Sequence, residues 1–173
     1  MCSTEDGIPH SERAKEVDVA SHETPAPAQV GRQARHWVET VLAKSPFAGP
    51  IGIEVISIEP ERVRLRLPYR AQLTTVGTVV HGGAIATLVD VAGSAASASA
   101  IRDDDGVTGG ATASLTLSYI APASEADLEA EAVVLTRSRA QTVSEIYVRD
   151  DAGALLAKGT VISRIFHAPA DRR

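Results

Sequence analysis

Asp90 is the residue with the clearest capacity for chemistry, because it is the only charged side chain in a long stretch of small and apolar residues, 79–101. A carboxylate in such surroundings must be paired, hydrogen-bonded or protonated. One interpretation is a structural aspartate held by a neighbouring backbone group or cation. The other is a catalytic carboxylate facing a cleft, which is a usual setting for such a group. The residue types alone leave both open.

The tripeptide His81-Gly82-Gly83 opens the same stretch. At the start of a helix the first backbone N–H groups lack acceptors within the helix, and the macrodipole adds partial positive charge there. Glycines let a substrate carbonyl approach those amides closely. Such a helix start can stabilise the oxyanion that forms when a carbonyl is attacked. A plain glycine-assisted turn into a helix is the alternative.

A buried helix is expected to position these residues. Ala84, Ile85, Leu88 and Val91 recur at three- and four-residue spacing and the other faces are apolar too, which is typical of a helix enclosed on all sides. Small side chains over 93–100 let another backbone surface approach closely. A membrane span is disfavoured, because a carboxylate near its centre would be costly. We therefore expect a helix enclosed by a sheet.

The sheet that encloses this helix is expected to have about six strands, at 51–58, 62–68, 112–120, 128–135, 142–148 and 154–166. The last four are expected to be antiparallel hairpin neighbours, so the pattern is α+β. Over 112–120, strict alternation puts Ala113, Leu115, Leu117 and Tyr119 on one face, with Thr and Ser opposite. The arginines that alternate over 62–66 fit either a solvated face or an anion site.

Composition and charge fit one folded domain, 30–168, between a disordered tail (1–29) and a short C-terminal tail (169–173). The N-terminal segment lacks an apolar signal-peptide core, so we expect a cytoplasmic protein. A net charge of −5 without a basic patch argues against a nucleic-acid partner. The single cysteine, Cys2, excludes a disulfide within the chain, and no metal-ligand spacing is present.

Three motifs together resemble the phenylacetate-pathway (PaaI-like) family of hotdog-fold acyl-CoA thioesterases. They are His81-Gly82-Gly83 with Asp90 at its spacing, Phe47-Ala48-Gly49-Pro50-Ile51-Gly52-Ile53, and Leu115-Thr116-Leu117-Ser118-Tyr119-Ile120-Ala121-Pro122-Ala123. The resemblance covers about 30–166. It implies a hotdog fold, an antiparallel sheet of about five or six strands wrapped around one long central helix.

The resemblance also implies an activity and a site. The expected reaction is hydrolysis of an acyl- or aryl-CoA, with Asp90 as general base or nucleophile, the Gly82 amide as oxyanion donor and Thr112 beside the attacking group. The resemblance, or the position along the chain, also implies substrate-binding roles for six residues. They are His81, Gly83, Thr75, Arg137, Ser138 and Arg139. Coenzyme A is part of the substrate, and no metal or other cofactor is expected.

Distance along the helix predicts an oligomer. Eight residues at about 1.5 Å each separate Gly82 from Asp90 by about 12 Å, whereas both must lie within roughly 3–4 Å of one carbonyl. The two groups that serve one substrate must then come from different subunits of a two-fold dimer. The resemblance extends this to a dimer of dimers.

Two other functions fit the same residues. A hotdog hydratase or dehydratase would use His81 as proton carrier, and a binding protein would retain acyl-CoA without cleaving it. Residues 30–44 have helical spacing and are expected to pack on the edge of the domain. Trp37 of that helix lies either in the core or against an acyl pocket.

Overall fold

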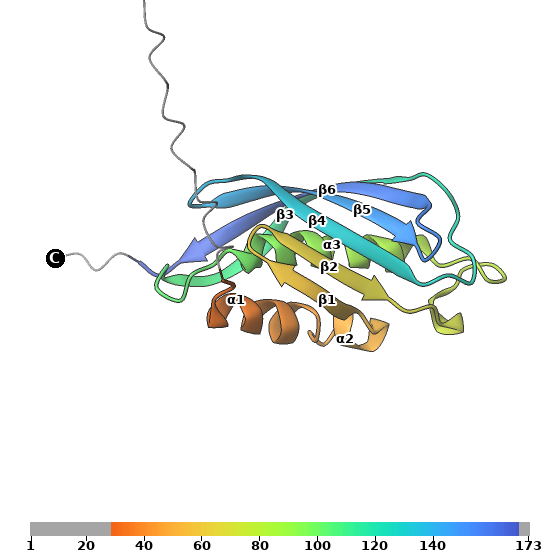
Figure 1. The fold of residues 1–173 in the computed structure, drawn as a ribbon, viewed down its shortest axis with the longest axis horizontal. Helices are drawn as coiled ribbons and strands as arrows, with labels where there is room; N and C mark the ends of the chain where they lie inside the picture. Colours follow the sequence, from red (N-terminus) through yellow and green to blue (C-terminus); the bar gives the residue numbers. More distant parts are fainter. Residues whose placement is uncertain (1–28, 170–173) are drawn as a thin grey trace, which may run out of the picture.

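The computed structural model describes residues 29–169, and within them the chain forms one long helix against a single six-stranded antiparallel sheet (Figure 1). The strand order is β1-β2-β4-β5-β6-β3, so β1 and β3 are the two edges. This is the predicted α+β hotdog arrangement, except that β3 and β4 are not hairpin neighbours as expected, because β3 pairs with β6 at the far edge of the sheet. The predicted tails, 1–29 and 169–173, lie almost entirely outside the described residues.

The long helix is α3, Gly82–Ser99, and it agrees with the stretch selected from the sequence. Figure 1 shows it between the sheet and a short helical segment near the N-terminus. The other elements are α1 (Arg32–His36), η1 (Trp37–Leu42), α2 (Ala48–Ile51), β1 (Glu54–Glu59), β2 (Arg62–Leu67), η2 (Ala71–Leu73), β3 (Val107–Tyr119), β4 (Leu128–Arg137), β5 (Gln141–Asp150) and β6 (Leu155–His167).

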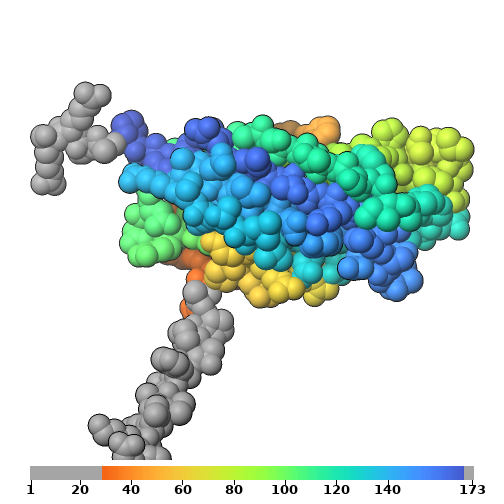
Figure 2. Space-filling view, turned by 90° about the horizontal axis from the view of Figure 1, so that it is seen from above, coloured from red at the N-terminus to blue at the C-terminus, as the bar shows by residue number. Residues whose placement is uncertain are grey.

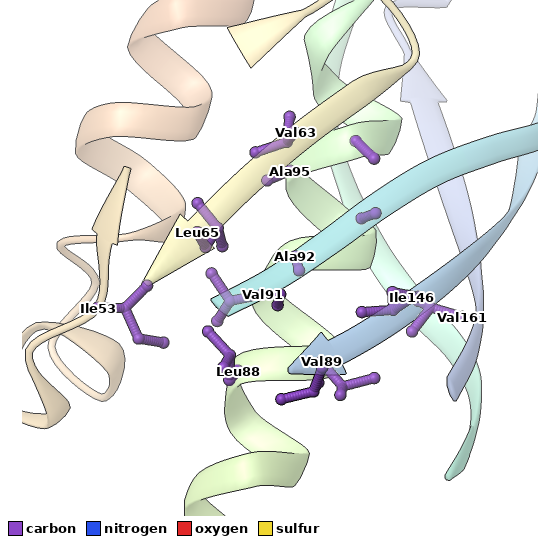
Figure 3. Close-up of a cluster of buried hydrophobic side chains, with 14 of the residues drawn as sticks. Ile53, Val63, Leu65, Leu88, Val89, Val91, Ala92, Ala95, Ile146 and Val161 are labelled. Atoms are coloured by element: carbon purple, nitrogen blue, oxygen red, sulfur yellow. The ribbon is translucent and has the colours of Figure 1, made fainter. Parts of the chain in front are cut away.

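The core lies between α3 and the inner face of the sheet, where Leu88 and Val89 of the helix are fully buried against β-strand side chains such as Val161 (Figure 3). Close approach requires glycine on both sides. A Cβ on Gly93 would lie 2.5 Å from the Cβ of Val161, and one on Gly159 would lie 2.6 Å from Cγ1 of Val89. The predicted role of small residues in close packing is therefore confirmed.

The helix is not enclosed on every side, which corrects the prediction. Ala86, Thr87, Asp90 and Ser94 are half-buried and form a stripe at three- and four-residue spacing. The sheet covers one face of α3 and the N-terminal segment covers another, so the stripe between them stays open beside β3. Asp90 is therefore partly solvated rather than enclosed.

The N-terminal segment also differs from its prediction. Instead of one helix over 30–44, the structure has a short α-helix, α1, followed by π-helical turns, η1, and both pack against α3 at the edge of the domain, as expected. Asp103 holds the start of this N-terminal segment, because its Oδ1 accepts a hydrogen bond from the backbone N–H of Gln33 at 2.8 Å. That hydrogen bond and Arg32 beside it hold the pKa of Asp103 below its usual range. Asp103 comes from the polar turn after α3.

Two strands begin more than two residues away from their predicted starts. β1 begins at Glu54 instead of 51, because Ile51 ends α2 and Gly52 follows it in the left-handed region at φ 85°. β3 begins at Val107 instead of 112. A β-bulge interrupts its pairing with β6 between Thr112 and Ser114, so side chains on either side of it do not follow one alternation.

The outer face of the sheet carries paired charges. Arg62, Arg64 and Arg66 of β2 form ion pairs with Glu131, Glu129 and Asp127 respectively. Of the two predicted alternatives, this supports a solvated face over an anion site. In the view from above, the blue strands of this face cover most of the surface, with β1 and β2 at one margin and β3 at the other (Figure 2). Within 29–169 no helix is long and apolar enough to cross a membrane.

Candidate active site

The start of α3 leaves one amide free. Nδ1 of His81 accepts from the Gly83 N–H at 2.8 Å, and the His81 carbonyl accepts from the N–H groups of Ala84 and Ile85. Among the described residues no acceptor faces the Gly82 N–H. Of the four amides at this helix start, three are satisfied locally and Gly82 retains a donor for a substrate oxygen.

Tyr119, at the end of β3, holds that free amide in place. Its hydroxyl donates to the Gly82 carbonyl at 2.8 Å, and a Cβ on Gly82 would lie 3.3 Å from the tyrosine ring. The absence of a side chain at Gly82 thus leaves room for the ring. The alternation of this strand predicts only a strand face for Tyr119, because the contact that gives it a role here spans 37 residues.

Asp90 is held by hydroxyls. Oγ1 of Thr112 donates to Oδ1 of Asp90 at 2.6 Å, across 22 residues of sequence. Because the single Thr112 proton is used there, the contact of 3.1 Å between Ser94 Oγ and Thr112 Oγ1 has Ser94 as the donor. The chain Ser94 to Thr112 to Asp90 fixes one carboxylate oxygen and leaves the other without a partner among the described residues.

The bulge in β3 makes this contact possible. Strict alternation from Leu115 would put Thr112 on the outer face, where the sequence pattern predicts the threonines of this strand. The extra residue at Ala113 shifts the alternation, so that Thr112 and Leu115 both face α3. Thr112 thus lies beside Asp90 as the family resemblance implied, for a reason that the two-residue pattern does not contain.

Asp90 borders a cavity of about 220 Å³ between α3, β3 and β6. Asp90, Ser94 and Thr112 line one end, and Trp37 of η1 closes part of the wall. Trp37 thus takes both predicted positions, because it lines the cavity and also packs half-buried against the core. The remaining lining comes from Leu42, Ser97, Ala98, Ile101, Gly109, Gly110, Ala111, Ser163, Arg164 and Ile165.

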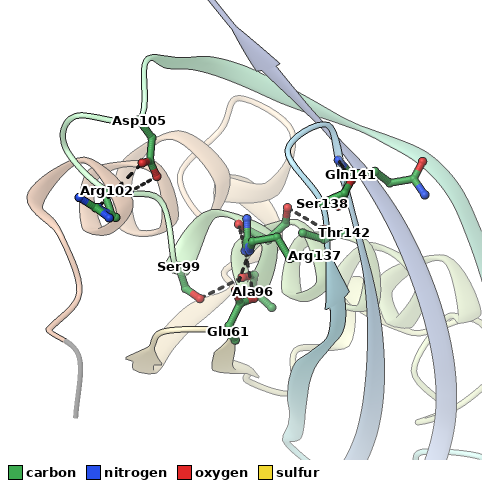
Figure 4. Close-up of polar contacts among 10 residues, drawn as sticks. Glu61, Ala96, Ser99, Arg102, Asp105, Arg137, Ser138, Gln141 and Thr142 are labelled. Carbon is green, nitrogen blue, oxygen red and sulfur yellow. Dashed lines mark hydrogen bonds and ion pairs between the residues drawn. The ribbon is translucent and has the colours of Figure 1, made fainter. Parts of the chain in front are cut away.

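The predicted substrate contacts on Arg137, Ser138 and Arg139 lie elsewhere. Arg137 donates through Nε and an Nη to Glu61, at 2.6 and 3.0 Å, and through an Nη to the Ser97 carbonyl at 2.7 Å (Figure 4). Ser138 makes the turn to Gln141. With Arg139 they line a second hollow of about 400 Å³, which shares Ile101 and Ile165 with the first.

The remaining predicted substrate contact, Thr75, is exposed in the loop before α3, where its amide donates to the Val79 carbonyl. The structure thus brings Asp90 and Thr112 together, and it places His81, Gly82 and Gly83 at the helix start eight residues away. It does not bring Thr75 or the arginines into contact with Asp90. Their binding roles stay predictions.

Comparisons with known proteins agree with this fold. Residues 77–157 match the thioesterase superfamily. "Putative esterase SSO1253" of Saccharolobus solfataricus is 31% identical over 121 residues, which cover 70% of this chain and 78% of that protein. A similar "Putative esterase VNG_1336C" of Halobacterium salinarum is 36% identical over 116 residues, covering 65% of this chain and 76% of that protein. This chain therefore belongs to the thioesterase superfamily and is a thioester-cleaving hydrolase.

Solved structures show the same hotdog fold. The PaaI protein of the phenylacetic acid degradation operon of E. coli superposes with a TM-score of 0.70 over 81% of this chain and 98% of its own, at 19% identity. A variant of the phenylacetic acid degradation protein PaaI from Thermus thermophilus gives 0.61 over 69% and 98%, at 25% identity. The predicted resemblance to PaaI-like thioesterases is confirmed.

Proposed function

We propose that this thioesterase hydrolyses acyl-CoA thioesters, with Asp90 as general base or nucleophile and the Gly82 amide of a second subunit as oxyanion donor. The observation that carries the proposal is Asp90 at the cavity rim, with one oxygen held by Thr112 at 2.6 Å. The free carboxylate oxygen is available to take a proton from water or to attack the carbonyl carbon. These steps use only protein groups and water, and the lack of a metal or other cofactor stays a prediction.

The Gly82 amide is proposed as the group that receives the developing negative charge. Its N–H has no acceptor among the described residues, and it lies at the positive end of an 18-residue helix. Gly82 and Asp90 are eight residues apart on this one helix, so about 12 Å separates them along its axis. One carbonyl cannot reach both groups of the same chain.

A homodimer through the β3 edge would supply the missing half. β3 has 13 residues, none of them charged or proline, and within the described part of the chain it pairs only with β6. Natural proteins usually protect such an edge, and a second strand can pair with it. Thr112, which holds Asp90, and Tyr119, which holds Gly82, lie seven residues apart on this strand.

Antiparallel pairing of β3 with its copy, about an axis near Leu115, would set Tyr119 of one subunit opposite Thr112 of the other. Each Asp90 would then face the helix start of the other subunit, giving two identical sites. Pairing of such dimers into tetramers and a cytoplasmic location stay predictions.

The dehydratase alternative is less well supported. It needs His81 as a proton carrier, and one ring nitrogen of His81 already accepts from the Gly83 N–H.

An activity measurement distinguishes the thioesterase from a protein that only binds acyl-CoA. Purified protein is incubated with aliphatic and aryl acyl-CoAs, and release of free thiol is followed.

We expect turnover that falls at least about a hundredfold in Asp90→Asn. Asp104→Asn, in the exposed turn after α3, is the matched control and should keep wild-type turnover. Retention of near-normal turnover by Asp90→Asn would remove Asp90 from the mechanism. Tight acyl-CoA binding without thiol release would favour the binding protein.

A further inference from the structure

The cavity beside Asp90 follows α3 towards its C-terminal end. Asp90, Ser94 and Ala98 all line it at four-residue spacing, so they lie on one face of the helix, and Ile101 lines it just past the helix end. Eight residues separate Asp90 from Ala98, which corresponds to about 12 Å along the helix axis. An acyl chain that fills this cavity from Asp90 would therefore extend along α3 towards Ile101.

A second hollow, of about 400 Å³, adjoins the far end of this cavity. Ile101 and Ile165 line both spaces, and they are 7% and 9% exposed. Ile101 directly follows the C-cap of α3, whereas Ile165 belongs to β6. The two isoleucines therefore lie between the cavity and the second hollow, one contributed by the helix side and one by the sheet.

The second hollow differs in its chemistry from the end of the cavity. Five of the nine residues that line it are polar or charged. They are Asp105, Arg137, Ser138, Arg139 and His167, and the first three of them are drawn in Figure 4. The methylene groups of an acyl chain gain free energy by leaving water for apolar surroundings, so a chain that reached this hollow would gain less there than in the cavity.

The volume of the cavity gives the length of chain that fits. Trp37 forms one side of it, and a Cβ on Gly109 would lie 3.8 Å from Cη2 of that ring, so the ring reaches from η1 to β3. A cavity of about 150 Å³ accommodates benzene, with its six carbon atoms. By the same proportion, the cavity of about 220 Å³ holds roughly nine carbon atoms.

We propose that Ile101 and Ile165 set the longest acyl chain that this enzyme hydrolyses efficiently. The proposal rests on the proposed acyl-CoA thioesterase function and specifies its substrate range. Up to the limit, each added methylene buries more apolar surface in the cavity. A longer chain meets the two isoleucine side chains, so it cannot place its thioester carbon at Asp90 without displacing them.

The test measures kcat/KM by thiol release for hexanoyl-, octanoyl- and dodecanoyl-CoA. We expect a rise from hexanoyl to octanoyl and a fall of at least about tenfold from octanoyl to dodecanoyl. Values that stay level or rise through dodecanoyl, or release from aryl substrates alone, would overturn the proposal while leaving the thioesterase function intact. No release from any aliphatic or aryl acyl-CoA would overturn the proposed function itself.

Variants then assign the limit to the two residues. Ile101→Ala and Ile165→Ala should each open the cavity towards the second hollow and raise the ratio of dodecanoyl to octanoyl kcat/KM at least about fivefold. Ile146→Ala is the matched control, because Ile146 is fully buried and lines neither space, so it should leave the ratio unchanged. Ile101→Val removes a single methyl group with less loss of stability and should raise the ratio by a smaller factor. An unchanged ratio in Ile101→Val and in the folded alanine variants, or an equal rise in Ile146→Ala, would refute the assignment.

Trp37 provides a measurement that needs no turnover. It is the only tryptophan in the chain and it lines the cavity, so fatty acids that enter the cavity should change its fluorescence. Titrations with octanoate and dodecanoate give the two dissociation constants. Ile101→Ala should tighten dodecanoate binding at least about fivefold relative to octanoate, and Ile146→Ala should not. A relative affinity that is the same in wild type and Ile101→Ala would contradict the proposal.

Discussion

The hydroxyl of Tyr119 bonds the carbonyl of Gly82 at 2.8 Å, which ties the end of the edge strand to the start of the central helix. If Gly82 supplies the oxyanion donor, this contact sets its position. Tyr119→Phe keeps the ring against Gly82 and removes one hydrogen bond, so we expect kcat to fall about three- to tenfold with little change in KM. Steady-state kinetics separates the two parameters. An equal rise in KM at constant kcat would instead indicate a role in substrate binding.

Gly82→Pro tests the amide directly. Gly82 is the first residue of α3, where proline is tolerated, and His81 before it has the extended conformation that proline requires, with ψ 133°. Proline therefore removes the N–H with little expected harm to the helix. We expect a loss of about a hundred- to a thousandfold in kcat. Gly82→Ala adds a Cβ at the same place but keeps the N–H, so it should retain most activity. Equal losses would mean that the Cβ, through Tyr119, is responsible.

The proposed site, shared between two subunits, predicts complementation between variants. When Asp90→Asn and Gly82→Pro subunits are unfolded together and refolded as a mixture, each heterodimer would contain one intact site. Random pairing should restore about a quarter of wild-type turnover. Each variant refolded alone serves as the control. A mixture no more active than its components would contradict a site built from two subunits.

Thr112 is expected to act through its hydroxyl. Thr112→Val keeps the shape and removes the bond to Asp90, so we expect kcat/KM to fall about ten- to a hundredfold, in line with a hydrogen bond to a charged group. Thr112→Ser keeps the hydroxyl and should retain at least about a third of the activity. If valine and serine variants behave alike, packing at this position would matter more than the hydrogen bond.

Gly159→Ala tests the close approach of β6 and α3. Its Cβ would lie 2.6 Å from Cγ1 of Val89, and such overpacking typically costs about 1–3 kcal/mol of unfolding free energy. Val89→Ala removes the obstructing methyl groups. The double variant should therefore be more stable in urea unfolding than the sum of the two single losses predicts. Strictly additive losses would show that the contact does not limit packing.

Asp127 gives a pH dependence of stability. The Tyr69 N–H donates to it at 2.6 Å and the Arg66 guanidinium lies beside it, so the pKa of Asp127 is below its usual range. A lowered pKa stabilises the folded state above the unfolded-state value of about 4, and this stability is lost as pH falls through the folded-state pKa. Asp127→Asn should lower the urea midpoint at pH of about 7 more than at pH of about 3. A deficit independent of pH would remove the charge from the explanation.

Much of the fold was predictable, because α3 and the strands follow from apolar periodicity, and because Asp90 and Gly82 stand in a recognisable motif. The partners of these residues were harder to predict. Thr112 faces Asp90 only because a bulge at Ala113 changes the alternation, and Ser163 lies beside Thr112 through pairing of strands distant in sequence. A two-residue pattern carries no information on either. Ser94 offered one signal, since it lies one helical turn after Asp90.

The open edge of β3, which has no charged residue and no proline, also affects how the chain behaves during folding and assembly. Until another strand covers it, this margin can pair with any extended polypeptide, including a misfolded copy. If the proposed dimer covers this margin, dilution or damage that uncovers it should promote precipitation, and solubility and assembly would depend on the same thirteen residues.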